Sequence, residues 1–467
     1  MTAMATTTNS ALFPADPAVR AIAAELYATV AEAPIISPHG HVSPSLLAED
    51  ERFPDPATLL LTHDHYVTRL LHAGGVDLAD LGVGGSDFDP RTAWRLLAGG
   101  WHRFAGTASG YWLEREFEEL FGITDEFTLD NADAVYDRID AALDDPQLRP
   151  RALFDRFRIA VLATTDDPLD SLEVHARLAR DRVVAGRVLP TFRPDAYLDP
   201  ESAGFASRVE RLLGETAQPH RDFASYLTAL ESRRAHFIAH GAVSADHGVV
   251  EPYTAALEPD AAEQLFQAAL RGELDAADAR EFRGHMLWQM ARMSVDDGLV
   301  MTIHPGVHRN HSSSTYARFG ADSGHDIPTG VEYVRNLRPL LESFGLERDF
   351  HLVLFTIDET SFSREIAPLA GFYPSVYIGA PWWFIDAPDA IQRFRSATVE
   401  TAGFYRSSGF IDDTRAFLSI PARHDMSRRS DAAFLARLVV EGRIRPPRAH
   451  RIIADLVDAI PREVFKL

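Results

Sequence analysis

Two histidines separated by one glycine, His39 and His41, follow a short apolar run at residues 34–37. If that run is a strand, residues two apart point to the same face, so both imidazoles could reach one metal ion at about 2.1 Å. The chain has no cysteine, so any metal must be held by histidine and carboxylate ligands. Such a pair also occurs as two ordinary loop histidines, and the chain contains 19 histidines. The pair alone therefore indicates a metal site without establishing one.

A pair of aspartates and an arginine lie near the other end of the chain. Asp413 ends the run at residues 409–413, and Arg415 follows two residues later. An aspartate at the end of a strand could complete a His2Asp metal site and serve as a general base. The alternative is an acidic turn that caps the next helix. Asp246, near a further predicted strand, is open to the same two interpretations.

Other predicted strand ends carry groups suited to an anionic ligand. Arg193, Arg309 and Arg415 offer forked donors that match a carboxylate, so we expect an anionic substrate. His304 and Trp382 add a polar and an aromatic group in similar positions. Any single arginine is more often a solvated ion-pair partner. The prediction therefore depends on a fold that brings these residues together.

Eight short apolar runs could form the elements that position these groups. They lie at residues 34–37, 159–165, 187–192, 236–243, 299–304, 351–356, 375–380 and 409–413. Helix-like stretches with apolar residues three and four apart separate most of them. This alternation is typical of a (β/α)8 barrel, whose active site lies at the C-terminal ends of the strands. We therefore predict an α/β fold, a distorted (β/α)8 TIM barrel, with the site at that rim.

The longest gap between runs, after the first one, predicts a helical insertion. Its stretches are helix-compatible and contain no long β-branched run. We expect an N-terminal helix and the first strand in residues 1–43, the insertion in 44–151, and the remaining barrel in 152–467. Tyr66 falls in the insertion, and nothing in its local sequence makes it catalytic, so packing is its default interpretation.

Composition and charge restrict the partners. The 467 residues are 46% hydrophobic and 24% charged, which excludes a disordered or collagen-like chain. The net charge of −22 argues against nucleic acid and anionic membranes, yet a few arginines in a cleft could still bind an anionic small molecule. No run of about 18 apolar residues and no basic, apolar leader is present, so we expect a cytoplasmic protein.

Nine longer motifs narrow the function further. They are PHGH near residue 40, HDHYVTR (63–69), YWLEREFEELFGI (111–123), LATTDDPLDSLEVH (162–175), VLPTFRPD (188–195), SADHG (244–248), MTIHPGVHRN (301–310), GAPWWF (379–384) and DDTRAFLS (412–419). Together they resemble the uronate isomerase (glucuronate isomerase) family, a branch of the amidohydrolase superfamily. The resemblance covers nearly the whole chain, and several motifs in order are more specific than one histidine pair.

The resemblance implies a metal-dependent aldose–ketose isomerase. Its members interconvert a hexuronate and the 2-ketouronate, such as D-glucuronate and D-fructuronate or D-galacturonate and D-tagaturonate. By position, the metal ligands would be His39, His41 and Asp413. The predicted catalytic residues are Asp413, Tyr66, Arg193 and Arg415, and the predicted substrate-binding residues are Trp382, His304 and Arg309. His304 could contact either metal or substrate.

Two departures from the family pattern leave an alternative open. Ser37 stands where the family commonly has an aspartate, and residues 356–359 replace a usual Asn-Pro-like sequence. A carboxylate lost beside metal ligands can change metal affinity. The alternative is a metal-dependent hydrolase, a lactonase or amidohydrolase acting on an acidic sugar derivative; a barrel kept only as a scaffold fits the preserved site residues less well.

Two further expectations concern the metal and the assembly. Zinc is the expected divalent metal, since His2Asp ligation with an open position suits it, while manganese and iron also fit. We expect a homo-oligomer, because barrel enzymes often associate.

Overall fold

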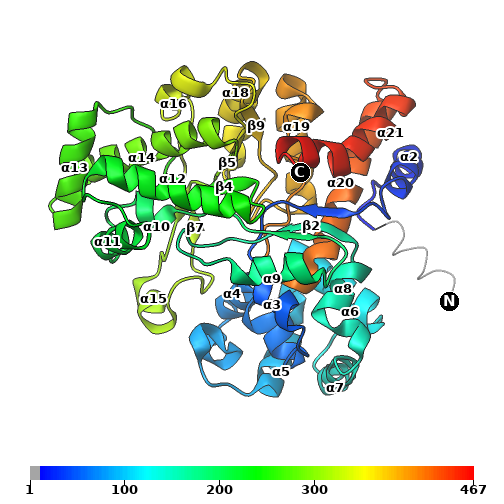
Figure 1. Ribbon diagram of the computed structural model, residues 1–467. Helices are drawn as coiled ribbons and strands as arrows, with labels where there is room; N and C mark the ends of the chain where they lie inside the picture. The colour runs from blue at the N-terminus through cyan, green and yellow to red at the C-terminus, as the bar shows by residue number, and fades with distance from the viewer. Residues whose placement is uncertain (1–10) are drawn as a thin grey trace.

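A computed structural model describes residues 11–467 (Figure 1). Seven parallel strands form the centre of the fold. One sheet has the order β1-β2-β3 and the other the order β4-β5-β8-β9, with parallel pairing throughout both. The strands are β1 (Ile35–Ser37), β2 (Ile159–Ala163), β3 (Arg187–Leu189), β4 (Ser244–His247), β5 (Val300–Ile303), β8 (Leu352–Leu354) and β9 (Val376–Ile378). Most of their residues are buried, as expected of parallel strands covered by helices.

Single bridges continue this hydrogen bonding beyond the regular strands. Phe192, after β3, bridges Ala245 in β4, and Ser407 bridges Ile378 in β9. The amide of His41 then donates to the carbonyl of Thr414 at 3.0 Å, which places residues after 407 beside the end of β1. The architecture is the predicted TIM-like α/β fold, and the C-terminal ends of its strands meet at one rim.

Two of the eight predicted strands are wrong. Residues 236–239 are the last turn of helix α12 (Phe223–Ala239), where Phe237 packs against Phe192 with ring centroids 5.2 Å apart, and β4 begins only at Ser244. Residues 409–413 form no regular strand. Gly409 and Asp413 have positive φ values of 75° and 42°, which interrupt an extended ladder.

The segment between β1 and β2 is helical, as predicted. Figure 1 shows these helices gathered below the strands. They are α3 (Pro44–Glu49), α4 (His65–Ala73), α5 (Pro90–Gly100), α6 (Ala108–Phe121), α7 (Ala132–Ala142) and α8 (Pro150–Arg156). Their apolar core includes Trp94 and Leu97 and continues onto the strands through Ile35 and Leu162. The insertion therefore packs directly on the barrel, while the boundaries 1–43, 44–151 and 152–467 stay predictions.

The remaining helices follow the other strands or cover the ends of the chain. They are α2 (Pro17–Ala28), α9 (Glu173–Asp181), α10 (Asp195–Leu198), α11 (Phe205–Glu215), α13 (Pro259–Arg271), α14 (Ala276–Asp297), α15 (Ser313–Phe319), α16 (Arg338–Phe344), α17 (Glu359–Ser361), α18 (Ala367–Phe372), α19 (Pro388–Ala402), α20 (Ile420–Val440), α21 (Pro446–Ala454) and α22 (Ile460–Val464). A short antiparallel pair, β6 (Val307–His308) with β7 (Ile327–Pro328), holds a loop at the rim. Within residues 11–467, no helix has the length and apolar character that crossing a membrane requires.

A buried carboxyl group in α6 makes stability depend on pH. Burial, together with the charge of Asp64, raises the pKa of Glu116 to about 8 from 4.5. Between these values the folded protein binds a proton that the unfolded chain releases, so stability falls as pH rises. We expect the free energy of unfolding of Glu116→Gln, measured by urea denaturation, to exceed that of wild type at pH 8. This difference should grow from pH 5 upward by up to about 1.4 kcal/mol per pH unit. A difference independent of pH would contradict this account.

Candidate active site

One cavity at the rim is lined by all nine residues to which the sequence assigned a catalytic, substrate-binding or metal-binding role. Its volume is about 420 Å³, within the range of small-molecule sites. The predicted residues that line it are His39, His41, Tyr66, Arg193, His304, Arg309, Trp382, Asp413 and Arg415. Their separate roles stay predictions, but the fold brings all of them together.

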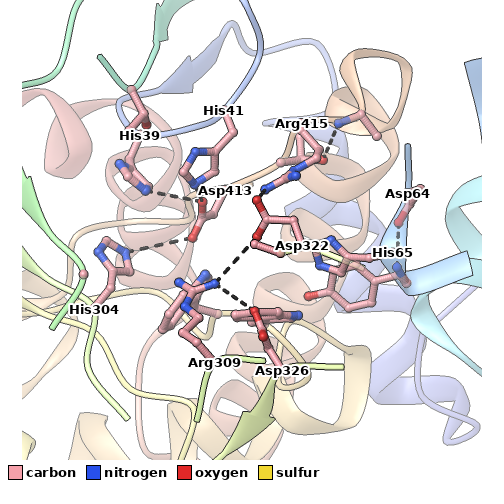
Figure 2. A pocket seen from close by; sticks show the side chains of 18 of the residues that line it. His39, His41, Asp64, His65, His304, Arg309, Asp322, Asp326, Asp413 and Arg415 are labelled. Atoms are coloured by element: carbon pink, nitrogen blue, oxygen red, sulfur yellow. Dashed lines mark hydrogen bonds and ion pairs between the residues drawn. The ribbon is translucent and has the colours of Figure 1, made fainter. Parts of the chain in front are cut away.

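Three histidines surround Asp413, as Figure 2 shows. Nε2 of His39 lies 3.3 Å and Nε2 of His41 lies 3.1 Å from Oδ1 of Asp413. Nε2 of His304 lies 3.9 Å from Oδ2. One ligand atom from each of His39, His304 and Asp413 lies within 4.8 Å of the others. By distance, His304 therefore joins the predicted ligands as a fourth candidate.

The donor set fits a divalent metal ion. Both carboxylate oxygens of Asp413 and Nε2 of His304 are buried without a hydrogen-bond partner among the described residues. Such atoms are costly to bury unless a ligand satisfies them. Imidazole nitrogens and a carboxylate suit zinc and other divalent first-row metals.

Asp246, at the end of β4, fixes the orientation of His304. Its Oδ1 lies 2.6 Å from Nδ1 of His304 and accepts a hydrogen bond from the Thr302 hydroxyl at 2.5 Å. Arg193 approaches Oδ2 at 3.1 Å. Burial raises the pKa of Asp246, but His304, His39 and Arg193 outweigh it and hold the pKa well below the usual value. The ionised carboxylate keeps the proton of His304 on Nδ1 and leaves Nε2 free to act as a ligand.

The backbone at Asp413 separates two adjacent carboxylates. A positive φ of 42° is uncommon for a residue other than glycine and indicates local strain of the kind found at functional sites. Asp412, one residue earlier, turns away and lies 3.0 Å from Nε2 of His424. Burial raises the pKa of Asp413, but His39 and His41 hold it well below the usual value. Asp413 is therefore the ionised carboxylate of the pair that faces the cavity.

Two arginines enter the cavity beside a pair of aspartates (Figure 2). Nη1 of Arg309 lies 3.0 Å from Asp326 and 4.0 Å from Asp322, and Nη2 of Arg415 lies 3.5 Å from Asp322. Both arginines and Asp322 remain partly exposed. A substrate carboxylate could therefore take over contacts that Asp322 makes in this structure.

Tyr66 reaches the cavity from the start of α4. Asp64 caps this helix by accepting a hydrogen bond from the amide of Tyr66 at 2.9 Å. The ring of His65 stacks on that of Tyr66, with centroids 5.3 Å apart. Burial and the charge of Arg415 lower the pKa of His65 to about 3, so this imidazole is neutral at physiological pH. The insertion thus supplies groups to the same cavity as the strands.

Sequence reasoning missed several polar residues of the cavity. They are Asp64, His65, Asp195, Asp322, Asp326 and Arg423. The first two lie in the motif that contains Tyr66, which was a usable signal. Asp322 and Asp326 lie in a glycine- and serine-containing loop between α15 and β7, where an aspartate is more often a turn residue.

Comparison with known proteins identifies the family. A sequence model of glucuronate isomerase matches residues 17–465. The chain belongs to the uronate isomerase family. The uronate isomerase of Corynebacterium efficiens is 54% identical over 458 residues, which cover 98% of each chain. The uronate isomerase of Cutibacterium acnes is 50% identical over 465 residues, which cover 99% of each chain.

Solved uronate isomerase structures share the fold. Glucuronate isomerase from Caulobacter crescentus superposes with a TM-score of 0.95 at 48% identity, covering 98% of this chain and 96% of that one. Uronate isomerase from Thermotoga maritima gives a TM-score of 0.92 at 26% identity, covering 98% and 99%. The predicted family, the isomerase class and the TIM-like fold are confirmed.

Proposed function

We propose that this uronate isomerase interconverts a hexuronate and its 2-ketouronate with one bound divalent metal ion. The substrates are D-glucuronate, giving D-fructuronate, D-galacturonate, giving D-tagaturonate, or both, and zinc is the metal. The observation that carries the proposal is the cavity itself. It combines the Asp413 cluster, which suits a metal ion, with Arg309 and Arg415, which suit a carboxylate.

The reaction requires the sugar ring to open, a proton to leave C2 and a proton to arrive at C1. The C2 proton is weakly acidic, so catalysis needs a base near carbon and stabilisation of the developing oxyanion. A divalent ion held by His39, His41 and Asp413, with His304 beside them, would supply Lewis-acid stabilisation of that oxygen. Asp413, ionised in the cavity, takes the proton of the neighbouring sugar hydroxyl and opens the ring.

The other cavity residues bind the substrate and take part in the proton transfer. Tyr66 acts as the partner acid and base through its hydroxyl group. Arg193 and Arg415 bind the carboxylate and steady the enediolate, and Arg309 lies beside Arg415. The ring of Trp382 forms a wall, edge-on to His304 at 4.7 Å.

Removal of one arginine should weaken substrate binding. We expect Arg415→Met to lower kcat/KM about 10- to 100-fold, largely through KM, because a charge-assisted contact to the carboxylate is lost. Arg338→Met, on the exposed face of α16, is the control and should change neither parameter. Steady-state kinetics at saturating metal measures both variants. An unchanged KM for Arg415→Met would contradict the assignment.

Analysis of the products distinguishes the proposed isomerisation from hydrolysis. Metal-replete protein would be incubated with D-glucuronate, D-galacturonate and a uronolactone in ¹⁸O-water, and each product identified by NMR and mass spectrometry. We expect one or both uronates to give the ketouronate at unchanged carbon skeleton, and the lactone to open no faster than without protein. Opening of the lactone with ¹⁸O in the new carboxylate, and no turnover of either uronate, would favour a hydrolase.

A further inference from the structure

We propose that Asp386, held by Arg423, is a positioning residue that orients the hydroxyl of Tyr66 and receives its proton during turnover. The inference rests on the proposed function, in which Tyr66 is an acid and base. Neither Asp386 nor Arg423 carries a role in the account above. Asp386 lies against the hydroxyl of Tyr66, and Arg423, which lines the cavity, lies over the ring of Tyr66.

The contacts of Tyr66 fix where its proton points. Its hydroxyl donates to the carboxylate of Asp386, at 2.9 Å from Oδ1 and 3.0 Å from Oδ2. The amide of Phe384 donates to the same hydroxyl at 3.3 Å. A tyrosine hydroxyl has one proton and two lone pairs, so one lone pair remains for a substrate atom. The hydroxyl is thus prepared to accept a proton from the cavity side.

Arg423 keeps the carboxylate of Asp386 in place. Its Nη1 lies 3.0 Å from Oδ2 of Asp386, and its Nε donates to the hydroxyl of Ser419 at 3.0 Å. Its guanidinium also lies 3.6 Å from the ring centroid of Trp112. Both members of the pair are buried, so few other geometries are open to them. A buried charged pair of this kind fixes the direction of a hydrogen bond better than a solvated one.

The backbone of the loop after β9 is bent to make these contacts. Trp383 and Phe384 have positive φ values of 30° and 69°, a strained conformation for residues with side chains. The bend lets one short segment place the Trp382 ring in the cavity, the Phe384 amide on Tyr66, and the Asp386 carboxylate behind it. One strained segment thus supplies three contacts to the same site.

The proton transfer balances within these groups. When Tyr66 accepts a proton from the substrate, a new O–H bond forms at its hydroxyl oxygen. The original O–H bond breaks, and that proton passes to Asp386. The reverse transfers return a proton to the sugar, so each turnover restores both side chains and needs no further reactant. Arg423 remains protonated throughout.

The simpler interpretation is a buried ion pair that only stabilises the fold. The chain offers a matched control for this, because Arg395 and Asp431 form a buried pair away from the cavity. Nε and Nη2 of Arg395 lie 2.6 Å and 2.8 Å from the two oxygens of Asp431. Asp431 lies on α20, the same helix as Arg423. A purely structural role predicts the same behaviour for both pairs.

A double-mutant cycle tests the inference. We expect Asp386→Asn to lower kcat about 10- to 100-fold, with KM changed less than about threefold, because only the proton transfer is impaired. In a Tyr66→Phe background, the same substitution should lower kcat less than about twofold further, since its effect passes through the missing hydroxyl. Asp431→Asn should lower thermal stability and have the same small effect on kcat in both backgrounds. If Asp386→Asn does not fold, Arg423→Lys, which keeps the charge, replaces it in the cycle. Its effect on kcat should likewise be large in the wild-type background and small in the Tyr66→Phe background.

The possible outcomes distinguish failure of the inference about Asp386 from failure of the proposed function. An active wild type in which Asp386→Asn acts equally in both backgrounds, or not at all, would overturn the inference alone. A wild type inactive on both uronates would overturn the proposed function and the inference with it.

Discussion

Asp413→Asn should lower kcat/KM for uronate isomerisation at least about 1,000-fold. Asparagine has nearly the same size but no charge and cannot accept a proton from the sugar hydroxyl. It also removes the carboxylate that lies between the ring nitrogens of His39 and His41. The loss should therefore combine weaker metal retention with failed proton transfer, and both are measured on the same preparation by kinetics and metal analysis.

The adjacent aspartate supplies a close control. Asp412→Asn makes the same chemical change one residue away, but Asp412 faces His424 instead of the cavity. We expect this variant to keep activity within about tenfold of wild type and to unfold at lower temperature, because a buried hydrogen bond is weakened. Equal losses in both variants would show that the region tolerates no change and would remove support for a specific role of Asp413.

Removal of the metal is the second large effect. Dialysis against a chelator should reduce uronate turnover below about 1% of the starting value, because stabilisation of an oxyanion by a metal ion contributes several kcal/mol. One equivalent of zinc should restore it. Turnover and metal content would be followed together, so that activity can be plotted against equivalents bound.

A histidine variant tests whether the metal removed by the chelator is bound at this cavity. His39→Ala should bind metal much more weakly, since the change removes one of the proposed ligands beside Asp413. His450→Ala, on α21 and away from the cavity, should bind one equivalent as wild type does. Full turnover at less than about one-tenth of an equivalent of metal would contradict the need for a metal.

The prediction of the fold succeeded where a strand is a short buried run between clear helices. β1, β2, β3, β5, β8 and β9 fall within their predicted runs. The strand predicted at 236–243 was wrong because Phe237 is a buried residue in the last turn of a helix. A short apolar run looks the same in the sequence whether it is a buried helix end or a strand. The segment at 409–413 failed because Gly409 and Asp413 have positive φ values, which an extended strand does not accommodate. Glycine adopts such a value readily, whereas an aspartate rarely does.

A site residue could be predicted from the sequence only where a chemically suitable side chain lies at the end of a predicted strand. His39, His41 and Asp413 lie at or near the ends of predicted strands, so the barrel rule brings them together in the prediction. Tyr66 came from family resemblance, since its helix carries no local sign of catalysis. Asp386 and Arg423 meet it only through the folding of a strained loop against α20, which no spacing along the chain reveals.

Ser37 stands where the family resemblance leads us to expect an aspartate. Its side chain is buried in β1, and its hydroxyl has no hydrogen-bond partner within the described residues. His39 lies two residues later and still reaches Asp413. The histidine cluster therefore forms with a serine, and no carboxylate, two residues before His39.

The most direct test is NMR of metal-replete protein with D-glucuronate and with D-galacturonate, beside His39→Ala under identical conditions. We expect ketouronate from at least one sugar with wild-type protein and none above background with the variant. No ketouronate from either sugar, with one equivalent of metal shown to be bound, would contradict the assignment of this cavity to hexuronate isomerisation.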